Sequence, residues 1–406
     1  MKNITYSELE GKSLGFYGLI GLVGTLILLG LFAAYHMEHH GHAVTGMTNQ
    51  IVWGMPHIFA IFLILAASGV LNVASISSVF RKTFYHPLAR LSALLAITLL
   101  IGGLSILVLD LGRPDRLIVA MTTYNFKSIF AWNIFLYNGF ILVVGVYLWF
   151  MMERRMQPYY PTAGLFAFIW RLILTTGTGS IFGFLVAREA YDTAILAPLF
   201  IALSLSLGLA VFLLVLVFDC KGTHCPLGDG VLHRPKKLLG VFVAAAFYFV
   251  LAYHLTNLYI TEQHGFEYFM LVNGGVYTLL FWVGYVVLGT ILPILLIYFP
   301  LFKNPRTSMI IAAVLVLVGG FSLLYVIIIG GQAYPLEIFP GMEVTSSSFF
   351  DLAEGGKHAY TPSHWEIMLG VGGVAIAVLL TLLALKILPF LPRSLADTDV
   401  DPEFID

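Results

Sequence analysis

Charge is scarce in this sequence. Only 11% of its 406 residues are charged, whereas 59% are hydrophobic. A globule of this size cannot hide so much apolar surface from water, so the composition excludes a water-soluble protein and indicates a polytopic membrane protein. The formal net charge is −1 and no long run of one sign occurs, which argues against a nucleic-acid partner.

Cysteine is nearly absent as well. Cys220 and Cys225 are too few for a disulfide framework, and we expect both thiols to be reduced. Their C-x4-C spacing, with His224 and His233 in the same loop, is not that of a usual zinc or cluster site. The sequence also lacks a Walker motif, a G-x-G-x-x-G before a helix and a cysteine cluster. We therefore expect no metal and no iron–sulfur centre of its own, so that a redox partner would be a separate subunit.

Long apolar runs, in contrast, are abundant. Ten runs of roughly 20 residues, enough to cross a bilayer, begin near Leu14, Trp53, Leu88, Ser128, Ala163, Ile195, Leu238, Gly274, Ser308 and Glu366. We predict an all-α fold of ten transmembrane helices, with turns at segments such as Gly228 to Pro235 and a long loop from Gln332 to Ser363. The first run is expected to stay as a helix, because Glu8, Glu10 and Lys12 precede it and no cleavage signal closes it.

Lys and Arg residues divide unevenly between the two sides that these helices define. Fifteen of the 21 fall on the side of the two termini, five fall on the other side, and Arg171 lies within a helix. By the positive-inside rule both termini are predicted to be cytoplasmic. In a bacterium the protein would lie in the cytoplasmic (inner) membrane, with the other loops facing the periplasm.

Asp110 closes the third apolar run, directly before the turn of residues 112–116. Carrying an acid into hydrocarbon costs about 2.5 to 3.5 kcal/mol or more, so an acid at the mouth of a membrane helix marks a candidate site. At about 1.5 Å per residue, His57, Asn133 and His254 are predicted to lie at the same level. We therefore expect a functional site near the periplasmic face.

The residue types near Asp110 suit a quinone. A quinone headgroup needs hydrogen-bond partners for two ring oxygens and a group that exchanges protons as electrons arrive or leave, which His57 and Asp110 can supply. The candidates for orienting the headgroup are Tyr124, Asn125, Ser128 and Asn133. The structural alternative is that His57 and Asn133 bond neighbouring backbone carbonyls. Asp110 would then pair with Arg113 or Arg116.

The end of the first helix is rich in histidine. His36, His39 and His40 share one helical face, and His42 follows them. Three imidazoles on one face could hold a metal. Solvation or contact with a partner is the interpretation we favour, because the backbone is already leaving the helix there.

Two further polar residues leave alternatives open. His254 could ligate a haem b together with a histidine from another helix, cap a proton route, or bond across helices. Arg171, next to a run of threonines and glycines, suits either a proton path or close helix packing with the guanidinium reaching toward the surface.

Three stretches of the sequence resemble the NrfD/PsrC family of membrane subunits. They are YHPLARLSALLAITLLIGGLSILVLDLGRPDRL, YNFKSIFAWN and YTPSHWEIMLGVGGVAIAVLLTLLALKILPFLP. The opening YSELEGKSLGFYGLIG, with GMPHIFAIFLILAASGVLNVASISSVF, is similar to the ten-helix branch that contains HybB and DsrP. Of these it looks most like DsrP, the membrane subunit of the DsrMKJOP complex.

The resemblance implies two four-helix bundles flanked by two peripheral helices. The expected parts are residues 1–50 with the first peripheral helix, 51–192 with the first bundle, 193–334 with the second bundle, and 335–406 with a periplasmic loop, the last helix and a cytoplasmic tail. It implies exchange of menaquinone or ubiquinone in the first bundle, where His57, Asp110, Tyr124 and Asn133 match the family region. His254 would belong to the second bundle. Some relatives carry an acid in the fourth helix, where this protein has residues 131–133 (AWN), so a carboxylate proton route there is not expected.

The resemblance also implies partners. They are a periplasmic ferredoxin-like iron–sulfur subunit (DsrO-like), docked near Arg113, Arg116 and Lys127, a multihaem cytochrome c (DsrJ-like) and a membrane and cytoplasmic redox module (DsrMK-like). The expected function is that of a quinone-interacting subunit of a sulfur-metabolism redox complex, with no complete active site alone. One alternative is a transporter or proton channel, which Pro293 would favour although the polar residues avoid the midplane. The other is a passive membrane anchor.

Overall fold

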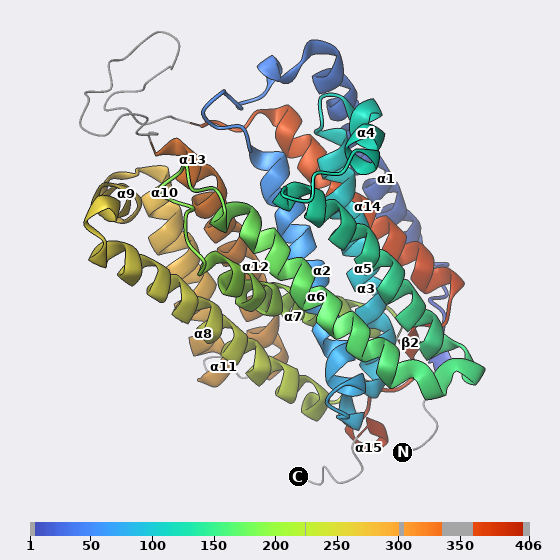
Figure 1. Cartoon of the computed structure of the whole chain (residues 1–406). Coiled ribbons are helices and arrows are strands. Elements are labelled where there is room, and N and C mark those ends of the chain that lie inside the picture. Colours follow the sequence, from blue (N-terminus) through green and yellow to red (C-terminus); the bar gives the residue numbers. More distant parts are fainter. Residues whose placement is uncertain (1–4, 224, 300–303, 335–359, 401–406) are drawn as a thin grey trace.

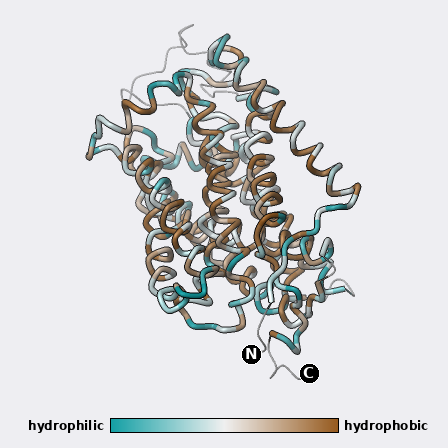
Figure 2. The backbone as a smooth tube through the Cα atoms, turned by 90° about the vertical axis from the view of Figure 1, so that its right-hand side faces the viewer, coloured by the Kyte–Doolittle hydropathy of each residue, from teal (hydrophilic) through white to brown (hydrophobic). Residues whose placement is uncertain are grey.

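The computed structural model describes residues 5–223, 225–299, 304–334 and 360–400. Within these residues ten helices are long and apolar enough to cross a membrane, which confirms the predicted number. Figure 2 shows that the hydrophobic residues occupy the middle of the helices, whereas hydrophilic segments gather toward the ends. The protein is a multi-pass integral membrane protein with an all-α fold.

The ten spans have defined bounds. They are α1 (Leu14–His40), α2 (Met55–Ser78), α3 (Ala89–Leu109), α5 (Ile129–Met152), α6 (Tyr160–Gly183), α7 (Leu196–Gly222), α8 (Asp229–Tyr259), the continuous run α10 (Val276–Leu279), η7 (Leu280–Ile291) and α11 (Leu292–Tyr298), then α12 (Pro305–Tyr325) with η8 (Val326–Gly330) and α13 (Gly331–Ala333), and α14 (His364–Ile387). Segments η7 and η8 are π-helical.

Short elements connect the spans. They are β1 (Tyr6–Ser7), η1 (His42–Val44), η2 (Thr83–Leu88), η3 (Pro114–Arg116), α4 (Leu117–Thr122), η4 (Arg154–Tyr159), η5 (Thr261–Gln263), α9 (His264–Tyr268), η6 (Phe269–Asn273), β2 (Leu391–Pro392) and α15 (Asp397–Val400). Of the predicted long loop from Gln332 to Ser363, residues 335–359 lie outside the described residues.

Helix α2 lies at the centre of the packing. It contacts α3, α6, α7, α12 and α14, while α5 packs on α6 and α8 packs on α7. The contact between α2 and α7 is close, because a Cβ built on Gly69 would lie 1.6 Å from the carbonyl oxygen of Ser204. Helix α1 packs chiefly on α14, which in turn packs on α3. The predicted division at residue 192 falls in the connection between α6 and α7 and stays a prediction.

The two termini meet on one side of the molecule. Strand β1 pairs antiparallel with β2, so that Tyr6 lies opposite Pro392. Figure 1 shows both ends of the protein at the bottom, and α4, α9 and α13 at the opposite end, called the site end below. Termini on the same side agree with an even number of spans. Which side of the membrane they face stays a prediction.

One predicted boundary is wrong. The turn expected at residues 228–235 is helical from Asp229 onward, so α8 begins nine residues before Leu238. The carboxylate of Asp397 accepts hydrogen bonds from the backbone nitrogens of Gly230 (3.3 Å) and Val231 (3.0 Å), which satisfies donors that a helix start leaves free. The first turns of α8 are polar and precede its apolar run. Composition alone placed the helix start at the beginning of that apolar run.

Candidate functional site

Asp110 lies at the site end, where it terminates α3. Its carboxylate is 2% exposed and lies between two imidazoles. The Nδ1 atom of His57, in the first turn of α2, is 3.2 Å from Oδ2 of Asp110. The Nε2 atom of His42 is 3.6 Å from Oδ1 and 3.1 Å from the backbone oxygen of the same residue. Two of the residues that the sequence analysis selected are therefore in contact, and His42 joins them.

This cluster has unused hydrogen-bonding capacity. Neither carboxylate oxygen of Asp110 nor Nδ1 of His57 has a hydrogen-bond partner among the described residues, because the two side chains are close but not aligned for a bond. Arg113, one of the two predicted partners of Asp110, lies 3.5 Å from Asp115 instead. A buried polar group without a partner costs about 1 to 3 kcal/mol, and more when charged. Such a group calls for a ligand or a water molecule that completes its bonds.

His42 connects the buried acid with the surface. It lies in η1, directly after α1, and its side chain is 36% exposed. The carboxylate of Asp110, 3.6 Å away, and the hydrogen bond to the backbone oxygen of the same residue raise the pKa of His42 above its ordinary value, although partial burial opposes the shift. The imidazole can thus take a proton from the side of the buried carboxylate and release it to water.

A glutamine holds the segment that leads into α2. The Oε1 atom of Gln332 accepts hydrogen bonds from the backbone nitrogens of Val52 (2.9 Å) and Trp53 (3.1 Å), and its Nε2 donates to the Trp53 oxygen (3.0 Å). Arg188 donates to the backbone oxygens of Gln50 (2.7 Å) and Gln332 (3.1 Å). These bonds tie the start of α2 to α13 and to the loop before α7. They fix Trp53 and, one turn later, His57.

A second buried acid, Glu366, ties α14 to the same region. It is fully buried, and its Oε2 accepts from the backbone nitrogens of Gly46 and Ser363, each at 2.8 Å. Its Oε1 accepts from the hydroxyl of Tyr360, which in turn accepts from the nitrogen of Met55 at 2.7 Å. Burial raises the pKa of Tyr360, which keeps that hydroxyl a donor. Glu366 is therefore satisfied, unlike Asp110.

Trp53 stands at the centre of an aromatic group beside His57. Its ring centroid lies 6.4 Å from that of His57, 6.0 Å from Phe130, 5.4 Å from Phe182 and 6.4 Å from Tyr191. These rings come from α5, from α6 and from the loop that follows α6. Aromatic faces at such distances provide a flat apolar wall next to the polar cluster.

Asn133 lies on α5, one turn beyond Phe130. Its Nδ2 donates to the backbone oxygens of Ile129 (2.9 Å) and Gly177 (3.0 Å), as the structural alternative predicted. Its Oδ1 is buried and has no hydrogen-bond partner among the described residues. One acceptor of Asn133 thus remains for a ligand, and its role in orienting a headgroup stays a prediction.

Tyr124, Asn125 and Ser128 lie in the connection between α4 and α5. The hydroxyl of Tyr124 donates to the backbone oxygen of Ala131, and Oδ1 of Asn125 accepts from the nitrogen of Lys127 at 3.0 Å. Ser128 precedes α5 without a capping hydrogen bond from its side chain. These bonds stay within the segment 124–131, so the structure does not link the three side chains directly to Asp110. Their role at a quinone stays a prediction.

His254 is part of a separate cluster between α8 and α9. Its Nδ1 lies 2.7 Å from Oε2 of Glu267, whose side chain is 0% exposed, and Asn257 donates to Oε1 of the same acid at 2.8 Å. The adjacent cavity, lined by His254, Tyr253 and mostly aliphatic residues, measures about 20 Å³. That is room for roughly one water molecule. A porphyrin does not fit there, so the haem b expected as an alternative at His254 has no support.

The histidines that end α1 stack with aromatic rings. The ring of His36 lies 4.0 Å from that of Trp365 and 4.1 Å from that of His40. Within the described part of the protein, no group of three or more His, Cys, Asp or Glu residues could hold a metal ion. Cys220 and Cys225 are free thiols.

Arg171 does not reach the surface. Its side chain is buried between α6 and α2, where it donates to Oδ1 of Asn72 (3.1 Å) and to the backbone oxygen of Ser68 (3.4 Å). The predicted extension of the guanidinium toward the surface is therefore wrong. The polar groups of α2 bind its two terminal nitrogens, whereas its Nε has no hydrogen-bond partner among the described residues.

Sequence reasoning missed three residues that shape these clusters. His42 was grouped with the solvated histidines that end α1, although it contacts Asp110. Glu267 and Gln332 were assigned no role, although both are buried in hydrogen-bond networks. The only available signal was the predicted level of these residues in the membrane, which puts them at the same face as Asp110.

Comparison with known proteins agrees with this architecture. The family model described as "Polysulphide reductase, NrfD" matches residues 43–335, which begin after α1 and end before α14. The Hdr-like menaquinol oxidoreductase integral membrane subunit of Archaeoglobus fulgidus is 27% identical over 405 residues, which cover 98% of this protein and 99% of that relative.

Other relatives belong to different reductases. A selenate reductase subunit of Mesobacillus selenatarsenatis is 25% identical over 402 residues, covering 90% of this protein and 92% of the relative. A polysulfide reductase polypeptide of Wolinella succinogenes is 27% identical over 316 residues, covering 70% of this protein and 96% of the relative. With a family match that spans eight of the ten membrane helices found in the described residues, this protein belongs to the NrfD polysulphide reductase family.

Proposed function

We propose that this protein is the quinone-interacting membrane subunit of a multi-subunit redox complex, and that Asp110 and His57 exchange protons with the quinone. The observation that carries the proposal is the buried carboxylate of Asp110, which lies beside two imidazoles and has no hydrogen-bond partner among the described residues. A quinol hydroxyl is the donor that such a carboxylate lacks. The similarity to a menaquinol oxidoreductase membrane subunit of Archaeoglobus fulgidus agrees with this ligand class.

The proton chemistry follows from the contacts of Asp110. Oxidation of a quinol to a quinone releases two electrons and two protons. The carboxylate accepts one proton from a hydroxyl within hydrogen-bond reach, and the neutral imidazole of His57 accepts the other. His42, which contacts the same carboxylate and is 36% exposed, passes protons to water. Reduction of a quinone uses the same atoms in the opposite direction.

The surroundings suit the shape of the headgroup. The rings of Trp53 and Phe130, with centroids 6.0 Å apart, offer flat apolar faces, and Oδ1 of Asn133 is a free buried acceptor one turn from Phe130. We assign the orientation of the ring to Asn133, with Tyr124, Asn125 and Ser128 in the segment that borders the approach. Menaquinone and ubiquinone both satisfy this chemistry.

The electrons require a partner, because the sequence offers no motif for an iron–sulfur centre. The loop after Asp110 is basic and exposed: Arg113, Arg116 and Lys127 stand beside the exposed apolar residues Ile118 and Phe126. We assign the docking of a ferredoxin-like iron–sulfur subunit to this surface, which then faces the periplasm.

The finer assignment rests on the sequence resemblance. We assign the protein to the DsrP branch of the family and to the inner membrane of a bacterium. Its partners in this assignment are DsrO-like, DsrJ-like and DsrMK-like subunits of a sulfur-metabolism complex.

The test is a reconstitution of the complex in liposomes that contain menaquinol, with reduction of the iron–sulfur partner as the readout. Asp110→Asn and His57→Ala are compared with Glu262→Gln, which removes an exposed acid from η5 and serves as the matched control. We expect Asp110→Asn to lower the rate on the order of 100-fold, the usual contribution of general acid–base catalysis, and Glu262→Gln to leave it unchanged.

Two outcomes would contradict the proposal in different ways. Equal rates for Asp110→Asn, His57→Ala and wild type in an intact complex would remove these residues from the site. Absence of quinol-dependent reduction in the wild type would instead favour the anchor or the transporter.

A further inference from the structure

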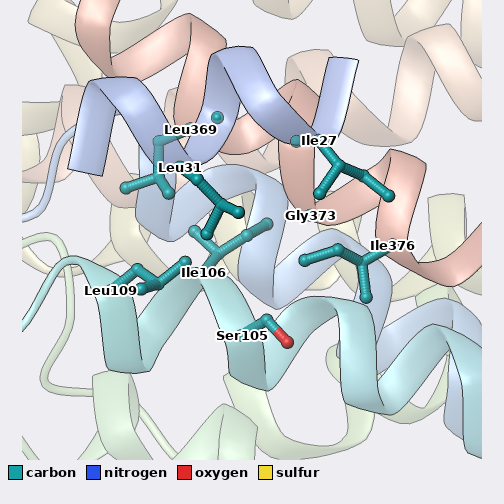
Figure 3. A pocket seen from close by; sticks show the side chains of 10 residues that line it. Ile27, Leu31, Ser105, Ile106, Leu109, Leu369, Gly373 and Ile376 are labelled. Atoms are coloured by element: carbon teal, nitrogen blue, oxygen red, sulfur yellow. The ribbon is translucent and has the colours of Figure 1, made fainter. Parts of the chain in front are cut away.

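An apolar groove runs between α1, α3 and α14. Its walls are formed by Ile27 and Leu31 of α1, Ile106 and Leu109 of α3, and Leu369 and Ile376 of α14. It is a shallow groove, with a volume of about 10 Å³ on the measure that gives about 20 Å³ for the cavity beside His254. Figure 3 shows these side chains pointing toward one another from the three helices. The groove contains one polar side chain, Ser105, whose hydroxyl donates to the backbone oxygen of Ile101 at 2.8 Å. Because this hydroxyl is already hydrogen-bonded to the backbone, the groove presents an apolar surface.

Glycines explain how the groove is built. A Cβ on Gly30 would lie 2.8 Å from Cα of Gly372, and a Cβ on Gly373 would lie 2.2 Å from Cγ1 of Ile106. Helix α14 therefore approaches α1 and α3 closely and forms the floor between them. The outer wall faces lipid, because Leu31 is 45% exposed and its neighbour Leu28 is 68% exposed.

The groove ends at the candidate quinone site. Leu109, which lines it, directly precedes Asp110, and Ile106 lies one turn below. On the other wall, α1 ends at His40, two residues before His42, whose imidazole contacts Asp110. The two walls thus converge on the unpartnered carboxylate. A molecule lying in the groove would have an apolar body against the helices and its polar end at Asp110.

We propose that this groove binds the isoprenoid tail of the quinone whose headgroup is bound at Asp110. The inference rests on the proposed function and adds the place where the tail lies. A tailed substrate needs an apolar surface that reaches from the lipid toward the headgroup, and this groove is exposed along α1 and ends at Leu109, the residue before Asp110. Helices α1 and α14 lie outside residues 43–335, so the shared family region does not account for two of its three walls.

The test compares two naphthoquinones that differ only in the tail: long-tailed menaquinone and menadione, which has none. Leu31→Trp fills the groove from its lipid-facing wall, where the half-exposed position tolerates a larger side chain. Leu28→Trp makes the same change on α1 outside the groove and is the control. Equilibrium binding is measured with the complex in nanodiscs, and a menaquinone with a photoreactive tail identifies the residues in contact.

We expect Leu31→Trp to weaken menaquinone binding on the order of tenfold, because a few buried CH₂ groups lose their contacts. Menadione binding should be unchanged, and Leu28→Trp should alter neither. The photoreactive tail should label segments of α1, α3 and α14.

Distinct results would overturn distinct claims. If the wild type binds neither quinone, the proposed function fails. If it binds both but Leu31→Trp weakens them equally or not at all, the headgroup site stands and the tail groove is wrong. Labelling of the groove by a photoreactive phospholipid, but not by the quinone tail, would assign it to a lipid and also overturn the inference.

Discussion

Two pairs of a histidine and a buried carboxylate lie at the site end, one between α2 and the end of α3 and the other between α8 and α9. In the pair formed by His254 and Glu267, the atoms are 2.7 Å apart and hydrogen-bonded, and Asn257 occupies the other carboxylate oxygen. In the pair formed by His57 and Asp110, the atoms are 3.2 Å apart and no hydrogen bond forms. The residue types are alike, and the difference lies in how many bonds the protein itself completes.

That difference separates a structural role from a functional one. A carboxylate whose bonds are all internal stabilises the fold, because removing a partner leaves buried polar groups exposed to an apolar environment. A carboxylate with open positions is costly for the isolated protein and becomes favourable when a ligand arrives. The pair of His57 and Asp110 is thus suited to binding, and the pair of His254 and Glu267 to holding α8 and α9 together.

The largest expected effect is on stability, and it concerns Glu267. Glu267→Ala should lower the free energy of unfolding by about 3 to 5 kcal/mol, because His254 and Asn257 both lose a buried partner. Asp110→Ala should change it by less than about 1 kcal/mol, since no hydrogen bond to the side chain is lost. Unfolding in mixed micelles measures both. Equal losses would show that the two pairs do not differ as described.

A smaller effect is expected from the network that positions His57 and Asp110. Gln332→Ala removes the partners of the backbone groups of Val52 and Trp53 and should cost about 1 to 3 kcal/mol. Part of that loss should appear as weaker quinone binding, because Trp53 and His57 are no longer fixed. Gln157→Ala, at an exposed position of η4, is the control. Unchanged quinone affinity in Gln332→Ala would separate this network from the site.

The smallest expected effect is a pH dependence carried by His42. Its pKa is raised in the folded state by the nearby carboxylate of Asp110 and by the hydrogen bond to the backbone oxygen of that residue, so the pairing stabilises the fold fully below the ordinary histidine pKa of about 6.5. The contribution is lost as the pH rises through the raised pKa. Because the side chain is 36% exposed, it should not exceed about 1 kcal/mol. The Tm difference between wild type and His42→Gln should thus be greatest at acidic pH and vanish at alkaline pH; the reverse order would contradict this linkage.

The ten helices could be predicted because each carries enough consecutive apolar residues to be recognised without knowledge of its neighbours. The same property limits the prediction at α8, where Asp229 to Lys237 form helix although they are polar. There the helix start is stabilised by Asp397, a residue 168 positions along the sequence from Asp229. An interaction between distant segments leaves no local pattern.

Two residues of the candidate site could be predicted, because a polar residue is easily recognised within an apolar run. Asp110 and His57 were selected in this way, and their level in the membrane suggested proximity; the two side chains lie 3.2 Å apart. His42 lies among the polar residues that follow α1, and Glu267 lies in a connection outside the ten predicted apolar runs, five residues after the exposed Glu262. Only packing decides which of two similar acids is buried.

The position of α1 has a consequence for the biogenesis of the protein. Helix α1 emerges from the ribosome well before α14, on which it chiefly packs, and β1 likewise precedes its partner β2. During translation α1 must therefore remain in the lipid without its partner while the eight intervening helices insert. A polypeptide truncated before α14 would insert in the membrane but leave α1 undocked.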